Sequence, residues 1–186
     1  MREKTFGMRA QLAVGEMGVE LAKRVLRIKY PVIRDLQNDK KQQNRGVDLH
    51  VEGLGYLEVK TDSHNPIRFF LELEVSGKPG TIYKSKADWF CFFFFNYQKM
   101  YLLPRVDLQH WMKRNVPDIK QEHPDWVKTI RSHASLTTWS AKGLVVPSQR
   151  VLQGVNTVVV SWVIEDDAIL CTVWDYPDGT VEEYYG

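Results

Sequence analysis

The sequence has few cysteines, almost no net charge and no long apolar run, and each shortage excludes a class of protein. Two cysteines among 186 residues are too few for a disulfide framework, and both lie in apolar runs typical of buried strands. The longest uncharged apolar run, Trp89–Phe95, is far shorter than the roughly 20 residues that span a bilayer. The charged N-terminus lacks the apolar core of a signal peptide. We therefore expect a protein of the reducing cytoplasm that is not inserted in a membrane.

The charge balance and composition narrow the choice further. A formal net charge of +2 gives no global field, so any affinity for nucleic acid must come from local basic patches. The hydrophobic fraction of 44% and the aromatic fraction of 12% are typical of a folded chain with a core. This length predicts one domain, with room for a small appendage. The five histidines are scattered and form no metal-ligand cluster with the cysteines.

The most informative stretch is 46–62, where two short runs alternate apolar and polar residues. Such alternation is typical of half-buried strands, with the apolar residues of each run on one face and the polar residues on the other. Glycines flank Leu54 between the two runs, and glycine accepts the positive φ angles of a tight turn. The sequence therefore predicts a β-hairpin with a loop at Gly53–Gly55.

This loop would bring four polar side chains onto one face. It would place Asp48 opposite Lys60 and His50 opposite Glu58, and opposed Cβ atoms lie about 5 Å apart. A slip of one residue would break the cluster, so the prediction depends on the loop length.

Two carboxylates and an ammonium at such distances suit one kind of chemistry. The carboxylates of Asp48 and Glu58 are oxygen ligands of the kind that Mg²⁺ or Mn²⁺ prefers. The amine of Lys60 would orient or deprotonate a water, or stabilise charge that grows on a phosphate. Together they predict hydrolysis of a phosphodiester. The alternative is an exposed strand face that carries an ordinary ion pair.

The same residues carry a resemblance to a known superfamily. Gly46-Val47-Asp48-Leu49, followed ten positions after the aspartate by Glu58-Val59-Lys60, resembles the core motif of the PD-(D/E)xK nucleases. That group includes restriction endonucleases and Holliday-junction resolvases. The resemblance covers roughly residues 10–105, and Val47 stands where the usual proline precedes the aspartate.

The resemblance implies both a fold and an activity. The fold would be α/β: an α+β mixed sheet flanked by helices, a restriction endonuclease-like three-layer core over 1–114. Residues 115–186 would add an insertion or lid and a C-terminal β-hairpin extension packed on the same domain. The activity would be that of a Mg²⁺-dependent deoxyribonuclease, in which Asp48 and Glu58 bind Mg²⁺ or Mn²⁺ and Lys60 is catalytic. The partner would be DNA in a bacterial or phage-encoded setting, and cutting both strands would suit a homodimer.

The predicted helix at 8–29 offers one more metal ligand. Nucleases of this superfamily often supply an acidic ligand from their first helix, and Glu20 lies nearer the apolar stripe than Glu16 does. We therefore expect Glu20 in the metal shell, and Glu16 after it. The alternative is a solvated glutamate paired along the helix with Lys23 or Arg24.

Two basic segments are predicted to contact the phosphates of DNA. Lys41 and Arg45 belong to a polar loop just before the motif, and Lys84 and Lys86 interleave with Tyr83. The alternative for all four is a solvated surface.

The remaining pattern predicts further elements. These are a strand at 67–75 next in the same sheet, a doubly buried strand at 87–95, a return strand at 100–103, a helix at 104–114 and a hairpin of 157–164 with 168–174. Residues 115–141 show no clear period and are interpreted as an insertion or lid with some helix, without assigned bounds.

Two other functions stay open. One is a non-catalytic nucleic-acid-binding or interaction module on the same fold. The other is an ordinary α/β domain in which the Glu-x-Lys strand is a coincidence, which would place Asp48 and Glu58 on opposite faces of the sheet.

Overall fold

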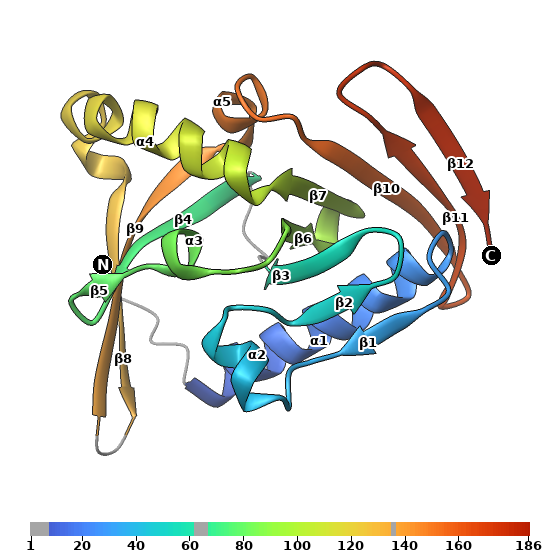
Figure 1. Cartoon of the computed structure of the whole chain (residues 1–186), viewed down its shortest axis with the longest axis horizontal. Coiled ribbons are helices and arrows are strands. Elements are labelled where there is room, and N and C mark those ends of the chain that lie inside the picture. The colour runs from blue at the N-terminus through green and yellow to red at the C-terminus, as the bar shows by residue number, and fades with distance from the viewer. Residues whose placement is uncertain (1–7, 62–66, 135–136) are drawn as a thin grey trace.

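The computed structural model describes residues 8–61, 67–134 and 137–186 (Figure 1). Its helices are α1 (Met8–Arg27), α2 (Lys40–Asn44), α3 (Thr81–Lys84), α4 (Arg105–Glu122) and α5 (Ser148–Leu152), with 3₁₀ turns at Phe95–Tyr97 and Pro124–Trp126. The strands are β1 (Ile33–Asp35), β2 (Leu49–Val51), β3 (Gly55–Thr61), β4 (Arg68–Val75), β5 (Lys78–Pro79), β6 (Trp89–Phe94), β7 (Lys99–Pro104), β8 (Val127–Ala134), β9 (Thr137–Pro147), β10 (Val158–Glu165), β11 (Ala168–Asp175) and β12 (Val181–Tyr185). The predicted α/β class is confirmed.

The strands form two sheets. The main sheet has eight strands in the order β1-β2-β3-β6-β7-β10-β11-β12, and the second has four in the order β5-β4-β9-β8. Within the described chain, β3 and β6 are the only neighbours that run parallel. The connection between them contains β4, β5 and α3, so the second sheet begins inside this crossover.

One face of the main sheet is covered by α1, the helix predicted at 8–29. Leu57 and Val59 of β3 and Cys91 of β6 point to this face because alternate strand residues share a side. They pack against the apolar stripe of the helix, which comprises Val19, Ala22, Val25 and Leu26. The helix therefore lies over the strand that carries the Glu-x-Lys motif.

The opposite face of the sheet is covered by α4 and the second sheet. Phe90, Phe92 and Phe94 of β6 are buried there with Phe69 and Leu71 of β4. β6 is thus buried on both faces, as its continuous apolar run predicted.

β4 does not join the main sheet, so the prediction that 67–75 is the next strand of that sheet is wrong. β3 is flanked by β2 on one side and by β6 on the other, and both of its edges are taken. β4 pairs with β9 instead, and its apolar face stacks on β6, with the rings of Phe69 and Phe92 4.6 Å apart. The alternation was recognised correctly, but alternation does not say which neighbour a strand selects.

The last third of the chain contributes to both sheets. The stretch without a clear period contains the end of α4, which runs on to Glu122 with Pro117 inside it, and the β8–β9 hairpin. The predicted hairpin of β10 and β11 is confirmed, and β10 pairs with β7 to extend the main sheet. The sheet curls so that β11 returns to α1 (Figure 1). In the described part of the chain, no helix has both the length and the apolar character to cross a membrane.

Candidate active site

The β2–β3 hairpin forms, but its register differs from the prediction. Its Cα partners are Leu49 with Leu57, His50 with Tyr56, and Val51 with Gly55. The predicted opposition of Asp48 to Lys60 and of His50 to Glu58 is therefore wrong. The loop is 52–54, one position earlier than expected, because Leu54 N donates to Val51 O over 3.1 Å and closes the turn there. Gly55 keeps a positive φ of 113° but already belongs to β3.

The change of register does not change which side chains share a face. The partners shift by two residues, and strand side chains alternate with a period of two. Tyr56, Glu58 and Lys60 therefore point to the same side of β3, away from α1, while Leu57 and Val59 point toward the helix. The face of the acidic and basic groups was predicted correctly even though their exact partners were not.

Asp48 lies just before β2 and is bound to β3 at two points. Its backbone N–H donates to Leu57 O over 2.8 Å, and its Oδ2 accepts a hydrogen bond of 2.7 Å from Val59 N. These two contacts flank Glu58 on β3. The Asp48 carboxylate is therefore held beside Glu58 by the backbone.

Glu58 and Lys60 form an ion pair on the same face. Lys60 Nζ lies 2.6 Å from Glu58 Oε1. The Glu58 side chain is 9% exposed and that of Lys60 is 34% exposed, so the carboxylate is buried and the lysine side chain is half-buried. Asp48, Glu58 and Lys60 are thus neighbours, as the motif required.

Neighbouring charges shift the pKa values of Asp48 and Lys60. Burial and, next, the Glu58 charge raise the pKa of Asp48 to about 7, although Val59 N and Lys60 act against this shift. Burial alone would lower the pKa of Lys60, but the Glu58 carboxylate outweighs it and the pKa is raised. At neutral pH the Lys60 amine is therefore protonated, while the Asp48 carboxyl is only partly ionised.

A divalent cation fits this pair of acids electrostatically. Burial and the repulsion from Glu58 both make the Asp48 anion costly, and a positive ion between the two carboxylates would offset this cost. In the described residues, however, no three side chains among His, Cys, Asp and Glu come together as one ion-binding group. Waters and substrate oxygens would have to supply the other ligands, which is usual for Mg²⁺.

The structure does not bring Glu20 to the acidic pair. Glu20 is exposed and pairs with Lys23 one turn further along α1. Lys23 is buried and also binds Asp35 Oδ2 of β1 at 2.7 Å. The helical period predicted correctly that Glu20 borders the apolar stripe, but the stripe packs on the face of β3 opposite Glu58. Glu16, the second choice, is likewise exposed on α1.

The two predicted basic segments do meet. Lys86 N donates to Arg45 O over 2.8 Å, and Ser85 Oγ donates to Gly46 O over 2.6 Å. Lys41, Lys84 and Lys86 are exposed, whereas Arg45 is half-buried. The contact joins segments about forty positions apart, immediately before Asp48 in the chain, and no local pattern in the sequence signals it.

Two further carboxylates, those of Asp35 and Glu72, also influence the charges of the site. Asp35 was not predicted, yet its charge contributes to the raised pKa of Asp48. Glu72 of β4 raises the pKa of Lys60, but its own carboxylate caps α3 by accepting from Thr81 N at 2.7 Å. Asp35 lies on β1 and Glu72 on β4, and the sequence alone does not show that these strands lie near the acidic pair.

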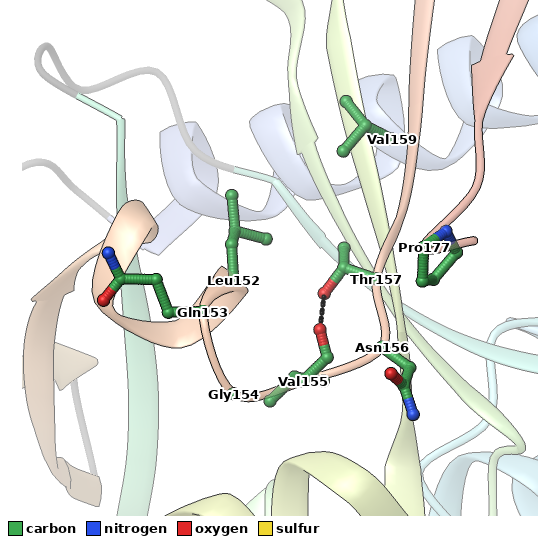
Figure 2. A pocket seen from close by; sticks show the side chains of 8 residues that line it. All are labelled: Leu152, Gln153, Gly154, Val155, Asn156, Thr157, Val159 and Pro177. Atoms are coloured by element: carbon green, nitrogen blue, oxygen red, sulfur yellow. Dashed lines mark hydrogen bonds between the residues drawn. The ribbon is translucent and has the colours of Figure 1, made fainter. Parts of the chain in front are cut away.

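A cavity elsewhere in the molecule contains none of these groups. Figure 2 shows it beside α5, with a volume of about 500 Å³ and a lining of Leu152, Gln153, Gly154, Val155, Asn156, Thr157, Val159 and Pro177. Its lining has no ionisable side chain, and Thr157 Oγ1 donates to Val155 O over 3.0 Å. It lacks the groups that hydrolysis needs.

Comparison with protein-family models, with curated proteins and with solved structures gave no match. The candidate function therefore depends on the residues of the β2–β3 hairpin and on what surrounds them.

Proposed function

We propose that this protein is a metal-dependent nuclease that hydrolyses phosphodiester bonds of DNA. The observation that carries the proposal is the meeting of Asp48, Glu58 and Lys60 on one hairpin, with Lys60 Nζ 2.6 Å from Glu58 Oε1 and Asp48 bound to Val59 N at 2.7 Å. The resemblance of these residues to the PD-(D/E)xK motif supports the same activity.

Asp48 and Glu58 would hold one or two Mg²⁺ or Mn²⁺ ions, and Asp48 would release its proton in doing so. A bound ion would polarise the scissile phosphate and lower the pKa of an attacking water. Lys60 is protonated, so it serves as a donor and not as a base. Its amine would orient the water and stabilise the charge that grows on the phosphate oxygens.

The joined basic segments would position the DNA strand. Lys41, Arg45, Lys84 and Lys86 lie on the segments that meet just before Asp48, so strand phosphates held there would lead to the acidic pair. Because the net charge of the whole protein is only +2, this local cluster would supply the attraction, and binding should weaken as salt rises. The free thiols of Cys91 and Cys171 suit the reducing interior of a bacterium, where its own or phage DNA would be cut.

The test is cleavage of a panel of linear and branched DNAs with Mg²⁺ and Mn²⁺. Glu58→Gln, Asp48→Asn and Lys60→Met should each reduce cleavage by at least about 100-fold, since each removes a charge needed at the phosphate. Glu20→Gln is the matched control and should stay within a few-fold of wild type, because Glu20 is exposed and pairs with Lys23, and among the residues that the structure describes it forms no ion-binding group with Asp48 and Glu58. Circular dichroism would verify that all four variants fold. Full activity of folded Glu58→Gln would refute the proposal.

A non-catalytic nucleic-acid-binding module is the second candidate. It is favoured by the Lys60–Glu58 pair, which already neutralises one acid, and by the lack of a third acid at the pair in the described residues. Calorimetric titration with Mn²⁺ separates the two. If the protein is a nuclease, wild type should bind the ion and Asp48→Asn should not. If it is a binding module, wild type and Asp48→Asn should give the same titration.

A further inference from the structure

Beside the acidic pair lies a row of side chains that crosses three strands. The register places Arg34 of β1 opposite His50 of β2, and His50 opposite Tyr56 of β3. Opposed residues share a face of a sheet. Their neighbours Ile33, Leu49 and Leu57 pack on the side of α1, so the row points to the other side. That is also the side to which Glu58 points.

The row carries rings and cations together. The rings of His50 and Tyr56 lie 4.6 Å apart at a tilt of 45°, and Arg45 Cζ lies 6.0 Å from the centre of the Tyr56 ring. His50 and Tyr56 are half-buried and Arg34 is exposed, so the group retains an open side. We call Arg34, Arg45, His50 and Tyr56 the ring platform.

We propose that the ring platform stacks an unpaired nucleobase next to the phosphate that is cut, so that the substrate is single-stranded or locally unpaired DNA. This rests on the proposed nuclease function and names its substrate class. Tyr56 precedes Glu58 by two strand residues, about 7 Å, which is on the order of one nucleotide of an extended strand. A base on Tyr56 would therefore place its neighbouring phosphate at the acidic pair.

The chemistry of the platform favours this occupant over others. Aromatic rings interleaved with cations are the usual means of binding a single strand, since each base offers a flat face and each phosphate a negative charge. A duplex cannot use the rings because its bases are already stacked on one another. The Asp88 carboxylate is bonded to the backbone of Tyr56, since its Oδ2 accepts from Tyr56 N at 2.8 Å.

The first test is binding without catalysis. Fluorescence anisotropy in EDTA would compare a labelled single-stranded oligonucleotide of thymidines with a duplex of equal length. Wild type should bind the single strand more tightly, and Tyr56→Ala and His50→Ala should each weaken that binding about tenfold while duplex binding stays unchanged. Tyr56→Phe, which keeps the ring, should bind like wild type. Tyr185→Ala is the matched control, because Tyr185 is an exposed ring on β12, which forms the other edge of the main sheet from β1.

The second test is cleavage, and it separates this inference from the proposed function. With Mg²⁺, Tyr56→Ala should lose rate on single-stranded DNA and keep its rate on any duplex that wild type cuts. If no DNA is cut but tight single-strand binding still requires the Tyr56 ring, the nuclease assignment fails and the platform stands. The platform is overturned if wild type prefers duplex, or if folded Tyr56→Ala binds single strands as tightly as Tyr185→Ala.

Discussion

Asp48 is the residue at which stability and the proposed function oppose each other. Its pKa of about 7 reflects an anion that is costly to keep beside Glu58 in a buried position. In the unfolded chain the group would titrate near its ordinary value of 3.8. Between about pH 4 and pH 7 the folded state therefore binds more protons than the unfolded state, and this site loses stability as pH rises through that window.

Asp48→Asn should stabilise the metal-free protein at pH 8. The amide oxygen can still accept from Val59 N, while the repulsion with Glu58 disappears. We expect a gain of roughly 1–3 kcal/mol, or several degrees in Tm, at pH 8 and almost no gain near pH 3, where Asp48 is mostly protonated in both states. Thermal melts in EDTA across pH 3–8 would measure it. Added Mn²⁺ should raise the Tm of wild type alone. A lower Tm for the variant at pH 8 would contradict the assigned cause.

Much of the residue-level site follows from the sequence, and the exceptions have physical reasons. A strand has a period of two, so Glu58 and Lys60 must share a face whatever their partners. The partners themselves depend on which residue closes the turn, and two glycines around Leu54 allow more than one loop. The sequence alone does not show whether Glu20 reaches the metal site, because helical periodicity identifies the apolar stripe of α1 but not the face of the sheet that this stripe covers.

At the scale of single elements, α1 is positioned by one small residue. A Cβ built on Gly18 would lie 1.7 Å from Thr61 Oγ1 and 2.7 Å from Thr61 Cβ, so the helix touches β3 there. Thr61 follows Lys60 at the end of β3, so the close approach of α1 at Gly18 also positions the end of this strand. Gly15, one turn earlier in α1, meets no atom within 4 Å.

The two glycines should therefore respond in opposite ways to alanine. Gly15→Ala should stabilise the protein by up to about 1 kcal/mol, since alanine is the better helix former and nothing obstructs it. Gly18→Ala gains the same propensity but must push α1 away from β3, at a net cost of about 1–3 kcal/mol. Urea denaturation of both variants would measure the difference. Equal stability of the two variants would show that α1 does not pack closely at Gly18.

Elements were predicted best where the chain shows one clear period. The stripe of α1, the alternation of β4 and the doubly apolar run of β6 each identified an element correctly. The assignment of β4 to a sheet failed because both edges of β3 are occupied, which is a property of the whole sheet. The β8–β9 hairpin was missed because the first half of β8 shows no buried alternation: Val127 is half-buried, and Lys128, Thr129, Ile130 and Arg131 are all exposed.

At the scale of the whole molecule, the first helix and the last strand are joined by one cation. Lys29, just after α1, contacts Tyr176 Oη and pairs with Glu182 Oε2 of β12. Its Nζ lies 4.8 Å from the ring of Trp174 and 4.7 Å from that of Tyr184. No local pattern predicts a contact between residues this far apart. The contact lies where the curled sheet returns to α1, and Figure 1 shows β11 beside the end of this helix.

This closure should contribute to stability in a pH-dependent way. Lys29 and, next, the Tyr176 and Tyr184 hydroxyls lower the pKa of Glu182 to about 2, against an ordinary value of 4.5. Burial acts against the charge of Lys29, but Glu182 outweighs it and raises the pKa of the amine. The stabilisation from Glu182 is therefore complete above about pH 4.5 and is lost as pH falls toward 2.

Lys29→Met should lower Tm at pH 7, because methionine keeps the apolar stem but loses both the ion pair and the contacts with the rings. The lost cation–π contacts alone predict a cost of about 1–2 kcal/mol, or roughly 2–8 °C. Lys29→Arg keeps the charge and should lose less. The gap between wild type and Lys29→Met should narrow as pH falls from about 4.5 toward 2, where Glu182 becomes neutral. Hydrogen exchange should show faster opening of the β12 amides in Lys29→Met, while those of β6 stay protected. Unchanged exchange in β12 would mean that the last strand is held by its pairing with β11 and does not depend on Lys29.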